Sequence, residues 1–318
     1  MEESNFHTSE GVTALVCGIL AIILSLFFVN IVSLVLAVIA IVTGVYARNK
    51  GDDYGTIGLI LGIFTIILTI ALSALLYYWL TSSVIWILLI FAFIPTLIYV
   101  AWIRNTEKYE REPWSALIFV FIWGATLSII SAIILEKLFE IPLIDFVNNG
   151  DIVTIMLGVI IAPAVEEFTK PLSMTTRIIR KNINEIEDGL IYGAVAGLGF
   201  SATENLLYGM YFSKEGIVVI IALFITRTIG SCLLHASATA LTGYGYSRYL
   251  IEKRPFASIL PFFLFAIMAH SIYNLFAFSS IYTDQIFGVI AAILFAIVAI
   301  TWIRKKIKKL DQEHPTDD

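Results

Sequence analysis

The sequence predicts an all-α polytopic membrane protein with about ten transmembrane helices. Hydrophobic residues make up 59% of its 318 residues, charged residues only 14%, and the mean hydropathy is +0.90. Soluble domains are about one quarter charged, so this composition excludes an ordinary soluble protein. The apolar residues fall in blocks of roughly 20, the length that crosses a bilayer core as a helix. They do not alternate with polar residues as a transmembrane β-barrel requires.

Ten apolar blocks separated by short polar loops define the predicted spans. Their approximate bounds are 11–29, 31–47, 55–80, 84–103, 115–136, 152–172, 189–208, 217–247, 256–280 and 286–303. We divide the chain into an N-terminal membrane module of about three helices, residues 1–83, and a second domain of about seven helices, residues 84–318.

The distribution of Lys and Arg predicts the orientation, because cytoplasmic loops of membrane proteins carry an excess of both. On the side opposite the N-terminus the loops carry only Lys137 and Lys214. The loops and tail on the N-terminal side carry Arg48, Lys50, Arg104, Lys108, Arg111, Arg177, Arg180, Lys181, Arg248, Lys253, Arg254, Arg304, Lys305, Lys306, Lys308 and Lys309. We therefore expect both termini to be cytoplasmic and the protein to reside in the plasma membrane.

The first three spans differ from the others in amino-acid composition. They contain Gly18, Gly44, Gly58 and Gly62 but no charged side chain. This stretch resembles a small helical membrane module that is fused ahead of other bacterial domains. With no group that could carry out chemistry, it is interpreted as a packing or regulatory module.

The sixth span contains the most unusual segment, with two adjacent carboxylates and a lysine inside an apolar block. Glu166 and Lys170 are four residues apart and share a helix face, while Glu167 is turned by about 100°. A charge in hydrocarbon costs about 3 kcal/mol or more, so these side chains need partners. A structural ion pair would need one glutamate, and the second points to proton transfer.

The seventh span combines a glycine stripe with a further carboxylate. Gly189, Gly193 and Gly197 recur every four residues, a spacing that lets a second helix pack closely. Glu204 follows them within the same span. Glycine stripes are common in membranes, whereas an intramembrane glutamate indicates function.

The eighth and ninth spans supply partners for these carboxylates. Arg227 is a natural counter-ion, and His235, eight residues later, is a proton carrier or metal ligand. His270 and Asn274 are four residues apart on one face, where the amide could orient the imidazole or donate to an oxyanion. A lone buried histidine is usually a core residue, but two beside three glutamates favour a functional site. Counting about 1.5 Å per residue from the span bounds places Glu166 about 10 Å closer to the cytoplasm than Glu204 and His270, and this offset shrinks if the sixth span starts later, after a surface segment that reaches to about Val153.

Taken in order, these motifs resemble those of the PrsW intramembrane proteases, which are similar to the wider group that includes the CAAX prenyl proteases. In that wider group the motif that contains the glycine stripe ends in His, whereas in this sequence the position is Glu204, as in the PrsW branch. The likeness covers roughly residues 84–303. The motifs are Glu166-Glu-Phe-Thr-Lys170, the run from Asp188 to Asn205 that ends Gly-Phe-Ser-Ala-Thr-Glu-Asn, His235, and His270-Ser-Ile-Tyr-Asn274. The resemblance implies cleavage of a single-pass membrane protein, in known cases an anti-sigma factor, as the first cut of a stress-signalling cascade. No nucleic-acid partner is expected.

Two mechanisms remain open for such a protease. In the first, Glu166 or Glu167 is the general base on a water, His270 shares the proton and Asn274 steadies the oxyanion. Lys170 and Arg227 then hold the remaining carboxylates in place. In the second, Zn²⁺ is bound by Glu204, His235 and His270, with Glu166 or Glu167 as base. The sequence alone does not establish a cofactor, and Zn²⁺ is the one that these residues could bind.

Two other classes of function compete with a protease. A proton-coupled transporter or channel also places Glu, His, Lys and Arg inside the membrane. It would be expected to show an internal repeat with interrupted helices in both halves, and the charged spans cluster in the C-terminal half instead. A scaffold without catalysis would not explain why so many costly polar groups lie in the membrane.

Overall fold

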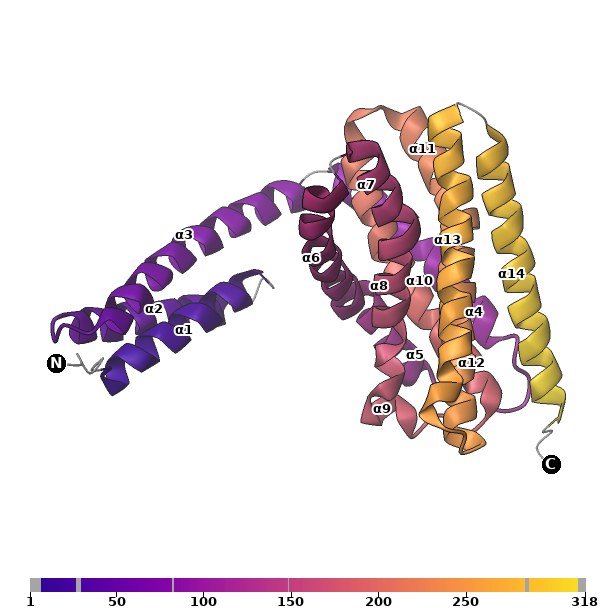
Figure 1. Cartoon of the computed structure of the whole chain (residues 1–318), viewed down its shortest axis with the longest axis horizontal. Coiled ribbons are helices and arrows are strands. Elements are labelled where there is room, and N and C mark those ends of the chain that lie inside the picture. The colour runs from indigo at the N-terminus through magenta and orange to yellow at the C-terminus, as the bar shows by residue number, and fades with distance from the viewer. Residues whose placement is uncertain (1–6, 27–29, 82, 148, 284–285, 314–318) are drawn as a thin grey trace. The chain divides into compact units, whose positions relative to one another are not determined.

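A computed structural model of the chain describes residues 7–26, 30–81, 83–147, 149–283 and 286–313 (Figure 1). Within these ranges the chain is helical almost throughout and contains no strand, which confirms the predicted all-α fold. The chain separates into two compact units, Met1–Trp86 and Ile87–Asp318, and each is described by itself.

The first unit is built from three helices, α1 (Ser9–Leu26), α2 (Asn30–Arg48) and α3 (Asp53–Thr81). Small residues let these helices approach to backbone contact. A Cβ added to Gly58 would lie 2.5 Å from the backbone of Ala14, and one added to Gly44 would lie 2.7 Å from the carbonyl oxygen of Gly55. The packing of this unit therefore depends on glycines, as in many membrane helix pairs.

Asp52 joins the start of the chain to the loop between α2 and α3. Its carboxylate is buried and accepts hydrogen bonds from the Thr8 backbone N–H at 2.6 Å and from the Thr8 hydroxyl at 2.7 Å. It also accepts one from the Tyr54 N–H at 2.9 Å, and His7 Nδ1 lies 3.3 Å away. The described charged groups of this unit thus gather at helix ends, outside its spans.

The second unit contains the remaining helices, and in it several spans are built from more than one helical segment. Its α-helices are α4 (Ser83–Arg104, beginning in the first unit), α5 (Trp114–Trp123), α6 (Ile129–Val147), α7 (Gly150–Met156), α8 (Ala162–Thr169), α9 (Arg177–Arg180), α10 (Ile186–Tyr211), α11 (Ile217–Thr226), α12 (Cys232–Ile251), α13 (Leu260–Thr283) and α14 (Ile286–Glu313). Short 3₁₀ segments are η3 (Lys170–Thr175), η4 (Phe212–Lys214) and η6 (Phe256–Ile259).

Nine helical stretches among the described residues are long and apolar enough to cross a membrane, and they correspond to nine of the ten predicted spans. The tenth is α10, which has 26 residues but carries many glycines and polar side chains. The protein is therefore an integral membrane protein whose least apolar spanning helix lies in the interior of the second unit.

Three spans of this unit are interrupted by π-helical turns, η1 (Gly124–Ser128), η2 (Leu157–Ile161) and η5 (Arg227–Ser231). A π turn releases backbone carbonyls for other donors and is common at functional sites. Here the Ala125 carbonyl accepts from the Thr203 hydroxyl at 2.7 Å, and the Gly158 carbonyl accepts from Asn274 Nδ2 at 2.7 Å. These turns thus connect neighbouring spans around the interior.

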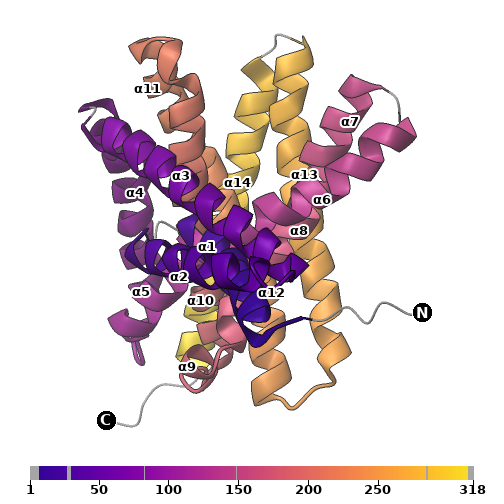
Figure 2. The ribbon, with the colours of Figure 1, turned by 90° about the vertical axis from the view of Figure 1, so that its left-hand side faces the viewer.

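α10 and α12 form the centre of the second unit, and both are buried over most of their length (Figures 1 and 2). The predicted glycine stripe of α10 faces α12. A Cβ at Gly193 would lie 2.6 Å from the Thr239 carbonyl oxygen, and one at Gly197 would lie 2.2 Å from that of His235. This close approach fixes α12, and with it His235, against the helix that carries Glu204.

Candidate functional site

Most of the polar residues singled out from the sequence line one cavity inside the second unit. The cavity measures about 660 Å³ and lies between α6, η2, α8, α10, η5, α12, α13 and α14. Those that line it are Glu166, Glu204, Arg227, His235, His270 and Asn274. Glu167 and Lys170 lie behind this wall, in contact with the lining residues.

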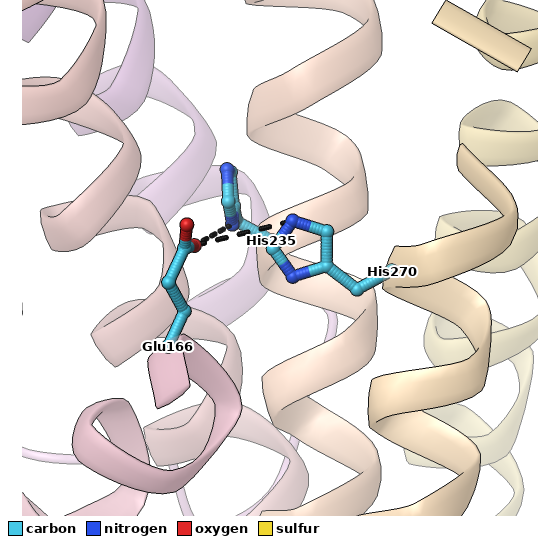
Figure 3. A group of neighbouring side chains, drawn as sticks. All are labelled: Glu166, His235 and His270. Carbon is cyan, nitrogen blue, oxygen red and sulfur yellow. Dashed lines mark ion pairs between the residues drawn. The ribbon is translucent and has the colours of Figure 1, made fainter. Parts of the chain in front are cut away.

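The centre of the site is a group of three side chains, Glu166, His235 and His270, each from a different helix (Figure 3). Glu166 Oε2 lies 3.8 Å from His235 Nδ1 and 3.9 Å from His270 Nε2. The two imidazole rings are nearly perpendicular, with centroids 4.8 Å apart. One ligand atom from each residue lies within 4.8 Å of the others, and all three residues are buried, so the group could hold one metal ion.

Each histidine is oriented by a second carboxylate on its far side. His270 Nδ1 lies 3.0 Å from Glu167 Oε1, and His235 Nε2 lies 2.8 Å from Glu204 Oε2. A ring nitrogen that donates to a carboxylate fixes the tautomer and leaves the other nitrogen as a lone-pair donor. His235 Nδ1 and His270 Nε2, the nitrogens that face Glu166, are therefore the ones prepared to bind a metal or accept a proton.

Lys170 neutralises part of the negative charge of this group. Its ammonium is fully buried and lies 3.0 Å from Glu166 Oε2, 2.8 Å from Glu167 Oε1 and 2.8 Å from His235 Nδ1. It also sits over the ring of Phe200, 4.4 Å from its centroid. The sequence places Glu166 and Lys170 on one helix face, and the structure shows that Lys170 pairs with Glu167 as well.

The two adjacent glutamates have different surroundings. Glu166 is 7% exposed and faces the cavity, whereas Glu167 is fully buried and does not line it. Glu167 Oε1 contacts Lys170 and His270, and its Oε2 accepts from the Thr239 hydroxyl at 2.8 Å. Glu166 is thus the carboxylate that can meet a water or a substrate, while Glu167 holds its neighbours in position.

Glu204 and Arg227 form a second ion pair beside the histidines. Arg227 Nη2 lies 2.7 Å from Glu204 Oε2, and its Nε donates to Asn205 Oδ1 at 2.6 Å. The guanidinium also lies over the ring of Tyr208, 3.9 Å from its centroid. These contacts fix Glu204, whose Oε2 in turn orients His235.

The structure differs from the sequence expectation in three respects. Glu166, rather than Glu204, makes up the possible metal group with both histidines, because Glu204 is drawn to Arg227 and to the outer face of His235. The expected offset of about 10 Å between Glu166 and His270 does not occur. It assumed uninterrupted α-helices of equal depth, and the span of Glu166 contains both a π and a 3₁₀ segment. Asn274 uses one N–H on the Gly158 carbonyl, which leaves its other N–H for the cavity.

The sequence reasoning missed Glu136, which lines the cavity near Lys137 and Glu140. Lys137 forms an ion pair with Glu140. Glu136 ends the fifth predicted span, where a charge normally marks the membrane interface, so nothing in the pattern distinguished it. Its position shows that the cavity extends from the histidines toward the end of α6 that lies before α7.

Comparison with known proteins identifies relatives for much of the second unit. The profile of a family described as "PrsW family intramembrane metalloprotease" matches residues 112–302. A protein named "Protease PrsW" from Clostridioides difficile (strain 630) is 35% identical over 167 residues, covering 52% of this chain and 67% of the relative. A second "Protease PrsW", from Geobacillus kaustophilus (strain HTA426), is 25% identical over 184 residues, covering 53% and 69%. No solved structure matches the chain.

Proposed function

Because the chain belongs to the PrsW family of intramembrane metalloproteases, we propose that the cavity around Glu166, His235 and His270 is its proteolytic centre. The chain is an intramembrane protease, and the proposal concerns where and how it cuts. The observation that carries it is the convergence of three buried ligand atoms within 4.8 Å, with each imidazole oriented by its own carboxylate.

The donor chemistry of this group fits Zn²⁺. Two imidazole nitrogens and one carboxylate oxygen make a common set for catalytic zinc, which leaves a further position for water. The carboxylates behind His235 and His270 are the outer partners that zinc-binding histidines usually have. The ammonium of Lys170 contacts two of the three ligand atoms, Glu166 Oε2 and His235 Nδ1, so a bound ion would have to take the place of these contacts. When bound, Zn²⁺ would polarise the substrate carbonyl and increase the acidity of a bound water.

The remaining residues position and transfer protons. Both ion-pair contacts of Glu204 use Oε2, so we assign its other oxygen, Oε1, as the acceptor for a proton from a water in the cavity that Glu204 lines. The second N–H of Asn274 can donate to the oxyanion that forms at the cleaved carbonyl. Glu167, Lys170 and Arg227 do not meet the substrate in this proposal, and they keep the histidines and Glu204 in place.

A metal-free mechanism is the second candidate, and the exposure of Glu166 favours it. Glu166 is the carboxylate of the adjacent pair that faces the cavity, so it could remove a proton from a water directly. In this version Lys170 holds Glu166 ionised, and His270 receives the proton. The two versions use the same residues in different roles: Glu166 and His270 are metal ligands in the first, and base and proton acceptor in the second.

The first test is proteolysis by the purified protein in detergent, combined with metal analysis. We expect Glu166→Gln and His270→Ala to lose cleavage by at least about 10²-fold and to lose one bound zinc per chain. Glu252→Gln, a change in an exposed ion pair with Arg248 and Arg254, is the matched control and should retain both. Cleavage that survives a strong chelator in zinc-free protein supports the metal-free version, and cleavage by both site variants would overturn the site.

We further propose that the substrate is a single-pass membrane protein and that an anti-sigma factor is the candidate to try first, as the family resemblance implies. The cavity lies among apolar spans, which supports a substrate that enters from the bilayer. The Lys and Arg distribution supports cytoplasmic termini. We also propose that the protein lies in the plasma membrane and that residues 1–83 have a packing or regulatory role. A panel of single-pass proteins with and without anti-sigma domains tests the substrate, and cleavage of neither group would reject it.

A further inference from the structure

Away from the cavity, five carboxylates are buried together at one end of the second unit. They come from three separate parts of the chain: the loop between α4 and α5, the first turn of α10, and the last turns of α14. They are Glu107, Glu112, Glu187, Asp188 and Asp311, and each is at most 4% exposed. The proposed protease mechanism uses none of them.

The hydrogen bonds within this acidic cluster come from neutral donors. Asp311 accepts from the backbone N–H groups of Lys108 and Tyr109 at 3.1 Å, and Asp188 accepts from those of Asn184 and Glu185. Glu112 accepts from the Tyr192 hydroxyl.

No Lys or Arg among the described residues forms a salt bridge with any of the five carboxylates. The nearby guanidinium groups are bound to the backbone instead: Arg104 Nε donates to the Glu112 carbonyl oxygen and Arg111 Nε to that of Glu107. The acidic cluster therefore lacks the positive charge that buried carboxylates require.

Three oxygen atoms in the acidic cluster have no hydrogen-bond partner. They are Oε1 of Glu107 and both carboxylate oxygens of Glu187, and both side chains are fully buried. Burial raises the pKa of Glu107 to about 8, and the nearby charges of Asp188, Glu187 and Asp311 add to the rise. Unpartnered buried carboxylate oxygens are rare, because each is costly to remove from water, and they point to an unseen ion or proton.

We propose that this acidic cluster binds one divalent cation of the oxygen-preferring class, with Ca²⁺ as its best representative. Oxygens of Glu107 and Asp188 lie within 4.8 Å of each other and of an oxygen of Glu185, a half-buried side chain that lies beside the cluster at the N-cap of α10. One ion with Ca–O distances of about 2.3–2.6 Å can bridge this spacing. The absence of nitrogen and sulfur from this donor set disfavours zinc, and a site built from several carboxylates disfavours Mg²⁺, which keeps most of its waters.

Such an ion would join the loop between α4 and α5 to the start of α10. The same helix carries Glu204 sixteen residues after Asp188, in the wall of the catalytic cavity. Binding at the acidic cluster would therefore stabilise the helix that positions part of the active site. The cation would act on the stability of the second unit without touching the substrate.

The test is thermal unfolding of the full-length protein in detergent, stripped of metal and then titrated with Ca²⁺ or Mg²⁺. Wild type should gain about 5 °C when Ca²⁺ is in hundredfold excess over its Kd, with a smaller gain for Mg²⁺. Glu107→Gln and Asp188→Asn keep the side-chain shapes and should lose this gain. In chelator, Glu107→Gln should unfold at or above the temperature of wild type, since it removes a buried carboxyl group that is costly to ionise.

Two controls separate this site from the catalytic centre. Glu252→Gln and His270→Ala should both keep the Ca²⁺ response, and equilibrium dialysis should show one Ca²⁺ per chain in His270→Ala. The proposal is overturned if wild type shows no Ca²⁺ shift, or if Glu107→Gln and Asp188→Asn shift as much as wild type. A wild type that is stabilised only by lower pH would contain protonated carboxylates and no cation site.

Discussion

The two units pack their helices through glycines in the same way but differ in the charged groups that they enclose. In both, glycines bring helix backbones together, as Gly58 does against Ala14 and Gly193 against Thr239. In the first unit the charged side chains of the described helices lie only in terminal turns, whereas the second unit encloses three glutamates, two histidines, a lysine and an arginine. Close packing of membrane helices therefore does not require charges, and the charges of the second unit are explained by chemistry.

The polar groups of the second unit also depend on one another. Glu166 and Glu167 both form ion pairs with Lys170. Glu204 forms ion pairs with Arg227 and His235, and each of these two also contacts other side chains. Removing one charge leaves another buried without compensation, which costs more than the lost contact. The described residues of the first unit show no such network of ion pairs within its spans, so single substitutions should act there through packing and helix-end contacts.

The largest effect is expected from Lys170→Met, which leaves two buried carboxylates without their cation. We expect cleavage to be lost and the free energy of unfolding to fall by about 3–5 kcal/mol. The double variant Lys170→Met/Glu167→Gln should recover part of the stability but not the activity. Denaturant unfolding in detergent and the cleavage assay measure both, and wild-type stability in Lys170→Met would show that the network is not coupled.

A matched pair of glycine substitutions compares the two units directly. A Cβ at Gly193 would lie 2.6 Å from the Thr239 carbonyl, and one at Gly58 would lie 2.5 Å from the backbone of Ala14. Each change to Ala should destabilise its own unit by about 1–3 kcal/mol.

Only Gly193→Ala should reduce cleavage, because it displaces the helix that carries His235. Hydrogen exchange resolved by segment, together with the cleavage assay, checks this. Equal losses of cleavage in the two variants would mean that the first unit takes part in catalysis.

The sequence was sufficient for the fold and for most of the site's members. The free-energy cost of placing an ionisable group in hydrocarbon makes every such residue conspicuous within an apolar span. This criterion identified Glu166, Lys170, Glu204, His235 and His270. The sequence also named Arg227 and the histidines as partners but could not assign which carboxylate each one contacts. Helix periodicity indicates a direction within one helix, but the pairing of Glu167 with Thr239 depends on how α8 and α12 are placed.

The π turns explain much of the side-chain orientation that helix periodicity could not predict. A single added residue in a turn rotates everything beyond it by about 100°, and no pattern in the sequence marks where this occurs. η2 lies just before the segment of Glu166, and η5 lies between the start of the eighth span and His235. Glu136 was missed for a different reason, since a charge at the end of a span is ordinary.

The smallest effect is expected from Asp52→Asn in the first unit. Hydrogen bonds from Thr8 hold the pKa of Asp52 below its usual 3.8. Because the folded-state pKa is the lower one, the stabilisation is complete above about pH 4 and is lost as pH falls through the folded pKa.

The exchange protection of α1 should therefore be lower in Asp52→Asn than in wild type by the same amount at pH 5 and pH 8, with cleavage unchanged. Hydrogen exchange at the two pH values measures it. A difference between wild type and variant that changes between pH 5 and pH 8 would show that a group titrating in this range, and not the Thr8 hydrogen bonds alone, controls this contact.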